Sequence, residues 1–202
     1  LFISLFGNLI HIEGVSYVDF IVPGVLLQCI AQGSSTTAIM VNKDVTSGIV
    51  SRFATLPIKQ RSVLNGHILE AFVRSVVSII VVLGIAALLG FRPSMQIRDI
   101  GIILLLLAGI ISVLSWLAVV VGVTAHSAEG ASSLSALAII LPYLSSGFVP
   151  TETLPKVLKP FAEHQPMTPM INTMRNAFLG NPFDGGMFLT ALAWCAGLTV
   201  VF

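Results

Sequence analysis

The stretch "IGIILLLLAGIISVLSWLAVVVGV", Ile100 to Val123, contains 24 residues and no charged side chain. A helix rises about 1.5 Å per residue, so roughly 20 apolar residues cross the hydrocarbon core of a bilayer. The stretch therefore predicts a membrane-spanning helix. The whole chain agrees with this reading, because its 202 residues are 55% hydrophobic and 9% charged. A soluble domain carries about a quarter charged residues.

Apolar runs of this kind recur along the chain and predict six membrane-spanning helices. They cover residues 1–10, 20–40, 68–89, 100–123, 131–149 and 187–202. The first and last runs are short for a span, so we expect both spans to be incomplete. No soluble domain or low-complexity segment divides the chain. Residues 1–202 therefore predict a single all-α transmembrane domain.

Consecutive spans place their connections alternately on the two sides of the membrane. One side receives residues 41–67 and 124–130, and the other receives residues 12–19, 91–99 and 150–186. Lys and Arg residues normally mark the cytoplasmic side. Here they are divided almost evenly between the two sides, so charge alone does not orient the chain.

The 41–67 connection contains an amphipathic pattern. Apolar residues recur at helical spacing, namely Val45, Ile49, Phe53 and Leu56. Asp44 or Thr46 can cap the start of a helix, and Pro57 can end it. We therefore predict a short amphipathic helix over residues 44–56.

The 150–186 connection contains two further apolar faces. The first consists of Leu154, Val157, Leu158 and Phe161, and the second of Met167, Ile171, Met174 and Phe178. The prolines in the intervening "HQPMTP" suit helix starts. We expect two short helices that lie at the membrane surface or dip into it as re-entrant segments.

Charged residues inside an apolar run are costly and often functional. Glu70 and Arg74 are four residues apart in the first turns of the 68–89 run, so they share a helix face and can form an ion pair. The arginine is close enough to the end of the span to extend toward the membrane surface. An interfacial anchoring pair is favoured over a transport role.

Two stripes of uncharged residues follow helical spacing within the spans. They consist of Gln28, Gln32 and Ser35 in one run, and of Ser132, Ser135, Pro142 and Ser146 in another. Polar faces avoid lipid because their hydrogen bonds need partners. Helix-to-helix contact and the lining of a translocation path explain the stripes equally well.

Several classes of function are disfavoured. The sequence has no phosphate-binding loop, no H-E-x-x-H metal motif and no nucleophile elbow, so it predicts neither catalytic nor metal-binding residues. A net charge of +1 gives no basic field for nucleic acid. Cys29 and Cys195 lie in apolar runs, where free cysteines behave as small hydrophobic residues.

The order of these parts, together with three motifs, resembles the permease subunits of ABC-2 type exporters, and most of all the daunorubicin-resistance (DrrB-like) permeases. The motifs are "KDVTSGIVSRFATLPIKQRSVLNGHILEAFVRS" at 43–75, "LLGFRP" at 88–93 and "SSGFVPTETLPKVLKPFAEHQPMTPMINTMRNAFLG" at 145–180. The likeness covers nearly the whole chain. It implies a multi-pass protein of a bacterial or archaeal cell membrane, surrounded by lipid, with the 41–67 connection in the cytoplasm.

The resemblance also implies partners. A separate ATP-binding subunit would bind ATP and Mg²⁺, while this chain would bind neither, and a second permease subunit, identical or paralogous, would complete the path. The coupling helix against the ATPase would be residues 44–56, with Asp44, Val45, Ile49, Arg52, Phe53 and Leu56 as contacts. The expected activity is export of a drug-like or other amphiphilic compound. Export of lipid or lipid-linked glycan is one alternative, and ATP-independent secondary transport is another.

Overall fold

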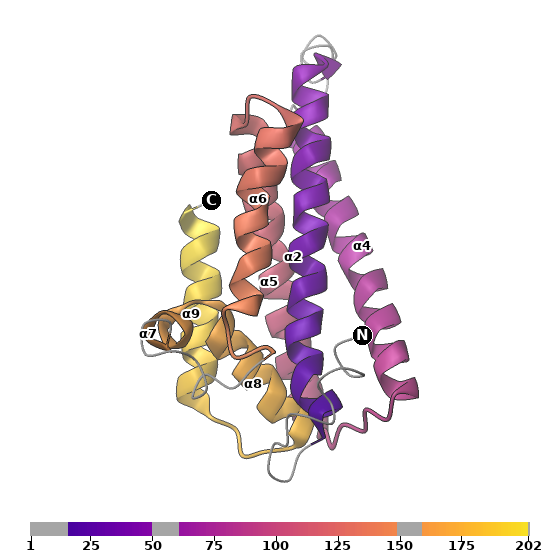
Figure 1. Cartoon of the computed structure of the whole chain (residues 1–202), viewed down its shortest axis with the longest axis vertical. Coiled ribbons are helices and arrows are strands. Elements are labelled where there is room, and N and C mark those ends of the chain that lie inside the picture. Colours follow the sequence, from indigo (N-terminus) through magenta and orange to yellow (C-terminus); the bar gives the residue numbers. More distant parts are fainter. Residues whose placement is uncertain (1–15, 50–60, 149–158, 202) are drawn as a thin grey trace.

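The computed structural model describes residues 16–49, 61–148 and 159–201, and these residues form helices without strands. Three of the helices are long: α2 (Tyr17–Thr46), α4 (Arg61–Leu88) and α5 (Ile97–Thr124) (Figure 1). Each has the length and hydropathy needed to cross a membrane. They coincide with the predicted spans 20–40, 68–89 and 100–123, and α2 and α5 are longer than predicted at both ends.

Two shorter helices occupy the positions of the fifth and sixth predicted spans. They are α6 (Ala128–Tyr143), with 16 residues, and α9 (Gly185–Val201), with 17. The span predicted over 131–149 thus ends early, because α6 stops at Tyr143, one residue after Pro142, and the chain turns from Leu144 to Phe148. The first predicted span lies outside the described residues, so the count of six spans is not confirmed.

The two short helices predicted in the 150–186 connection are present as α7 (Lys159–His164) and α8 (Met167–Leu179). The apolar face predicted for α8 is buried, including Met167, Ile171, Met174 and Phe178. It packs against α2, α5 and α9. Gly180 ends the helix with φ +66°, a left-handed conformation that glycine adopts without steric cost. The first predicted face falls mostly on residues 149–158, which are not described.

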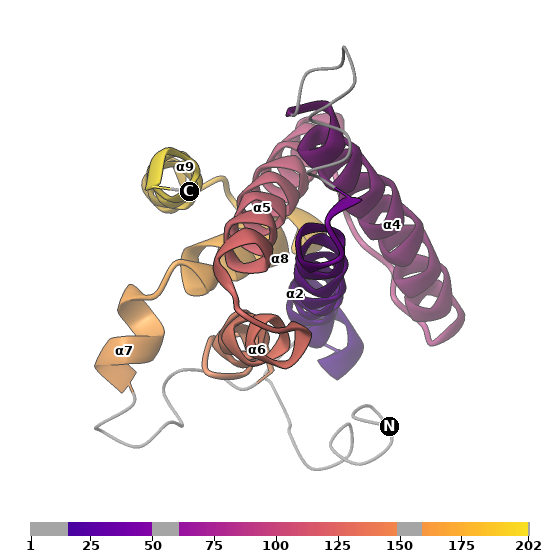
Figure 2. The same cartoon turned by 90° about the horizontal axis from the view of Figure 1, so that it is seen from above.

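Helix α2 is the centre of the bundle and contacts α4, α5, α6 and α8 (Figure 2). Helix α4 lies at the side and exposes apolar residues along its length, including Leu69, Val77 and Ile80. Such a surface suits contact with lipid, which can cover apolar side chains without cost.

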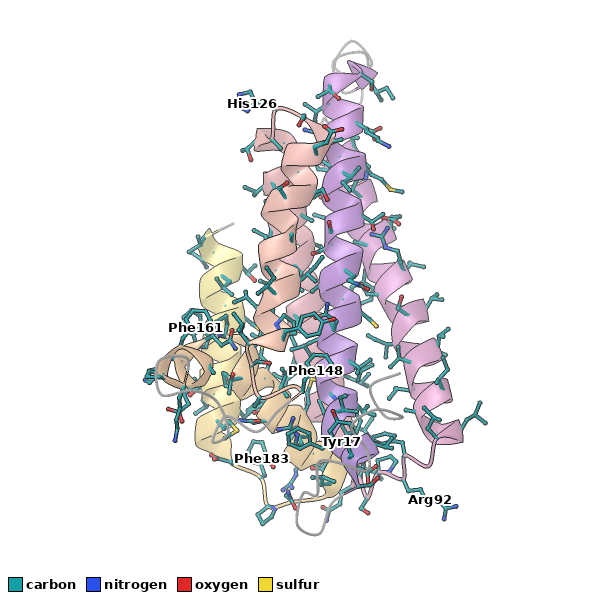
Figure 3. All side chains as sticks on the ribbon, in the orientation of Figure 1. Tyr17, Arg92, His126, Phe148, Phe161 and Phe183 are labelled. Atoms are coloured by element: carbon teal, nitrogen blue, oxygen red, sulfur yellow. The ribbon has the colours of Figure 1, made fainter. Side chains whose placement is uncertain are left out.

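The described connections alternate between the two ends of the bundle, as predicted. Helix α2 ends and α4 begins at one end, called the α2–α4 end here, and the α5–α6 turn with His126 lies there too (Figures 1 and 3). The α4–α5 connection with Arg92 lies at the opposite end, together with α7 and α8, and this is called the α8 end (Figure 3).

Candidate functional site

The segment predicted to couple to an ATPase begins inside a membrane helix. Asp44 and Val45 belong to the last turns of α2, which continues to Thr46. Gly48 then leaves the helical path with φ +74°. The boundary predicted at Asp44 is therefore corrected: no residue before Gly48 breaks the helix, so α2 extends beyond its apolar run.

Asp44 joins the ends of two helices. Its Oδ2 lies 3.0 Å from Nε2 of His67 on α4. Val45 is half-buried and Ile49 is exposed. The other predicted coupling residues, Arg52, Phe53 and Leu56, lie outside the described part of the chain. The Asp44–His67 contact means that a displacement of the α2–α4 connection would act on both helices.

A residue that the sequence analysis did not identify fixes α2 against α5 at this end. The Asn42 side chain is buried, and its Nδ2 donates to the carbonyl of Gly122 at 3.0 Å and to that of Ala125 at 2.6 Å. Carbonyls at a helix C-terminus lack partners within the helix. Asn42 therefore supplies hydrogen-bond donors to two carbonyls at the C-terminal end of α5. The one signal in the sequence that could have pointed to Asn42 is an amide side chain at the end of an apolar run.

The predicted ion pair between Glu70 and Arg74 is present, with Nη1 to Oε1 at 3.0 Å. The Arg74 side chain also contacts α2. Its Nη2 donates to the carbonyl of Gly33 at 3.0 Å and to the Thr37 hydroxyl, both on α2. The arginine thus ties α4 to α2, while the Glu70 carboxylate is partly exposed.

The residues of the two polar stripes have different surroundings. Gln28 is buried, and neither polar atom of its amide has a hydrogen-bond partner among the described residues. Gln32 is exposed, and Ser35 and Ser132 are half-buried. The side chain of Ser135 is outside the described part, and Pro142 is buried near the end of α6.

Ser146, the last residue of the second stripe, belongs to a buried cluster around Arg175 of α8. Arg175 donates from Nε to the carbonyl of Phe20 at 3.1 Å, from Nη1 to Oδ1 of Asn172 at 3.0 Å, and from Nη2 to the carbonyl of Ser146 at 2.6 Å. The Ser146 hydroxyl donates to the same Asn172 oxygen at 2.7 Å. One guanidinium therefore connects α8 to the start of α2 and the end of α6.

Within the described residues, Arg175 has no carboxylate partner. Its guanidinium carbon lies 3.7 Å from the centre of the Phe20 ring, and the ring face stabilises the cation. Burial lowers the pKa of Arg175 to about 10, which still leaves it charged at pH 7. Carbonyl dipoles and an aromatic ring thus stabilise the charge. Local sequence spacing does not reveal these contacts.

Long apolar helices, a central helix tied to its neighbours by buried polar contacts, and short helices at one end define a helical integral membrane protein. The sequence pattern of the ABC-2 type transporter family matches residues 1–179. The chain belongs to this family, whose members are the membrane subunits of ABC transporters and work with a separate ATP-binding subunit. The resemblance inferred from the three motifs is confirmed.

Two relatives indicate where in the family the chain falls. It is 31% identical over 206 residues to the daunorubicin resistance ABC transporter permease protein DrrB1 of Streptomyces coeruleorubidus, covering 100% of this chain and 71% of the relative. It is 32% identical over 204 residues to the probable doxorubicin resistance ABC transporter permease protein DrrC of Mycobacterium tuberculosis, covering 96% and 71%. The chain is thus related to permeases of drug-resistance ABC transporters.

Proposed function

We propose that this chain is the membrane-spanning permease subunit of an ABC exporter that moves a drug-like or other amphiphilic compound out of the cell. The similarity to drug-resistance permeases over the whole chain carries this proposal. A separate subunit would bind ATP with Mg²⁺ and hydrolyse it. The membrane would be the plasma membrane of a bacterium or archaeon.

In this proposal the α2–α4 end faces the cytoplasm, and residues 44–56 form the contact with the ATP-binding subunit. The Asp44–His67 contact supports this role because it links α2 and α4 beside that segment. A displacement imposed by the ATPase would move both helices together. Through Asn42 it would also reach the end of α5.

A second permease subunit would complete the translocation path. Within one chain, α2 packs so closely against the turn that follows α6 that a Cβ on Gly24 would lie 2.6 Å from the carbonyl oxygen of Gly147. A path lined by the polar stripes of these two helices would therefore run between two subunits. Gln32 is the exposed residue of the α2 stripe and is therefore the one best suited to face a polar group of the cargo, whereas Gln28 is buried within one chain.

The test is co-purification of the full chain with an ATP-binding subunit, followed by ATP hydrolysis assays with candidate compounds. We expect a chain with a phosphate-binding loop to co-purify and drug-like amphiphiles to stimulate hydrolysis. Stimulation by lipid or lipid-linked glycan alone would replace the drug assignment. Transport by the purified chain without ATP would contradict the proposal.

A paired substitution tests the coupling segment. Arg52→Glu with Phe53→Ala is expected to abolish ATPase binding and transport. The matched control, Arg92→Glu with Phe183→Ala, changes an exposed arginine and an exposed phenylalanine at the α8 end (Figure 3), and should leave ATPase binding intact. Full binding and transport by the first variant would show that the coupling assignment is wrong.

A further inference from the structure

The motif "LLGFRP" at 88–93 ends α4 with a turn. Helix α4 stops at Leu88, and Gly90, with φ +97°, redirects the chain so that the Phe91 N–H donates to the Ala86 carbonyl at 2.9 Å. A left-handed glycine followed by such a bond is a common end of a helix. The Phe91 side chain that follows the turn is buried.

The residues after this turn are fastened to the end of α8. The rings of Phe91 and Phe178 pack edge to face, with their centroids 5.3 Å apart. The Ser94 N–H donates to the Phe178 carbonyl at 3.0 Å. Gly180 lies so close to Ser94 that a Cβ on it would overlap the Ser94 carbonyl oxygen. These contacts, called the α4–α8 junction here, join the end of α8 to the end of α4.

Toward its other end, α4 is attached to α2 by two polar contacts. One is the contact between His67 and Asp44, and in the other Arg74 donates to two groups of α2. Arg74 lies seven residues after His67 and fourteen before Leu88, which are about 10 Å and 21 Å along the helix axis. It thus divides α4 into a short arm, residues 61–73, and a long arm, residues 75–88.

The long arm has room to move toward α2. Helix α4 diverges from α2 toward the α8 end (Figure 1), and an apolar crevice of about 200 Å³ lies between the two helices there. Val22 and Val25 of α2 and Val82 and Ile85 of α4 are among its lining residues. The side-chain hydrogen bonds between described residues of α2 and α4 all lie at Arg74 or before it. A rotation about Arg74 would therefore close the crevice without breaking a hydrogen bond of the long arm.

We propose that α4 is a lever that turns about Arg74 and moves α8. A displacement of the α2–α4 connection acts on the short arm, the long arm closes the crevice, and the α4–α8 junction moves α8 with it. Helix α2 resists the same displacement because Gly24 lies against the backbone of the turn after α6, whereas Gly66 and Gly84 of α4 meet no neighbouring atom within 4 Å. The inference rests on the proposed function, because the ATP-binding subunit supplies the displacement.

Hydrogen exchange of the full chain in lipid nanodiscs tests the lever without an ATPase. Arg74→Met removes the pivot, so exchange of the α4 and α8 amides should rise about tenfold, as the loss of hydrogen bonds from a charged group predicts. Arg74 bonds to α2 and to Glu70, so an effect on α8 has to travel along α4. Helix α6 packs against α2 as α8 does, and its amides should exchange as in the parent chain.

A second substitution weakens the junction. Phe91→Leu removes the ring contact with Phe178 and keeps an apolar side chain. In this background Arg74→Met should still raise exchange of α4, but that of α8 by less than about threefold. Phe188→Leu is the matched control, because Phe188 forms a ring pair with Phe183 at 5.5 Å that is not part of the junction. In that background the full response of α8 should remain.

Filling the crevice tests the movement itself. In the chain assembled with its ATP-binding subunit, Val82→Phe should lower export about tenfold, because the closed position would be overpacked. Its thermal unfolding midpoint should not fall, since the open crevice has space for the ring. Val77→Phe makes the same change at a position of α4 that is 54% exposed, and it should export at the parent rate.

The inference would be overturned by α8 exchange that Arg74→Met leaves unchanged, by an equal rise in α6 and α8, or by equal α8 responses in the Phe91→Leu and Phe188→Leu backgrounds. Full export by Val82→Phe would also overturn it and leave the exporter assignment in place. Failure of the proposed function would appear instead as a parent chain that binds no ATPase, and the exchange experiment would still decide on the lever.

Discussion

At the scale of single residues, Arg175 shows how a charge can be structural in a membrane protein. Ser146 lies beyond the end of α6, where its carbonyl has no partner from a next helical turn. Arg175 supplies that partner and reaches the start of α2 with the same side chain. The desolvation that lowers its pKa is offset by three hydrogen bonds and the Phe20 ring. Removing the arginine would leave the buried Ser146 carbonyl without this donor and would remove the second hydrogen bond to the Phe20 carbonyl.

Arg175→Met is therefore expected to lower the free energy of unfolding by about 3 kcal/mol, because buried acceptors lose charge-assisted hydrogen bonds. Arg175→Lys should recover part of the loss, since an ammonium group cannot reach all three acceptors at once. Unfolding of the purified chain in detergent measures both. Arg92→Met, at an exposed position near the same end, is the control and should have little effect. Equal stability of the Arg175→Met and Arg92→Met variants would contradict the account.

At the scale of helices, α2 is held by contacts that leave no room for a side chain. Near its start, Gly24 approaches the backbone of Gly147 in the turn after α6. Near its end, a Cβ on Gly122 of α5 would lie 2.7 Å from the Ala38 carbonyl oxygen. Small residues allow such close approach between membrane helices. Helix α4 lacks contacts of this kind at Gly66 and Gly84, and Arg74 instead provides polar contacts to α2.

Gly24→Ala should destabilise the bundle by about 1–3 kcal/mol, because the new methyl group would overlap backbone that cannot rotate away. Gly84→Ala meets no atom within 4 Å and should be neutral or slightly stabilising through its higher helix propensity. Thermal unfolding of the two variants provides the comparison. A Gly24→Ala variant as stable as the parent chain would show that α2 and the turn after α6 can separate freely.

Two substitutions in α4 separate the ion pair from the link between helices. Arg74→Met removes the bonds to Gly33 and Thr37 and should loosen α4, whereas Glu70→Gln removes only a partly exposed ion pair worth about 1 kcal/mol or less. Hydrogen exchange of α4 amides measures the difference. Equal protection in both variants would indicate that the arginine acts only through Glu70.

At the scale of the whole molecule, the two ends of the bundle differ in construction. At the α2–α4 end, the Asp44–His67 contact joins α2 to α4, and the Asn42 hydrogen bonds join α2 to α5. The α8 end contains the Arg175 cluster. The proposed orientation places the α2–α4 end in the cytoplasm.

Single cysteines test this orientation in a chain with Cys29 and Cys195 replaced by alanine. Arg92→Cys should react with a membrane-impermeant maleimide in intact cells, because Arg92 lies at the α8 end (Figure 3). His126→Cys, at the opposite end, should react only after the membrane is permeabilised. The reverse labelling pattern would place the α2–α4 end outside the cell.

The features that could be predicted from sequence are local. A long apolar run commits the chain to a membrane helix whatever its neighbours are, so the positions of α2, α4 and α5 were correct. The Glu70–Arg74 pair needed only a spacing of four residues. The buried face of α8 followed from periodicity within one helix. The family could be recognised because its motifs are also continuous in sequence.

The remaining features depend on residues that are distant in the chain. Arg175 meets Phe20, and Asn42 meets Gly122, only because three helices pack side by side. The bonds from Arg74 to α2 also depend on what lies across the interface. A hollow of about 260 Å³ beside Gln165 combines residues from α6, α7 and α9. Local spacing can specify a helix and its faces, but packing alone decides which faces meet and which polar atoms remain without partners.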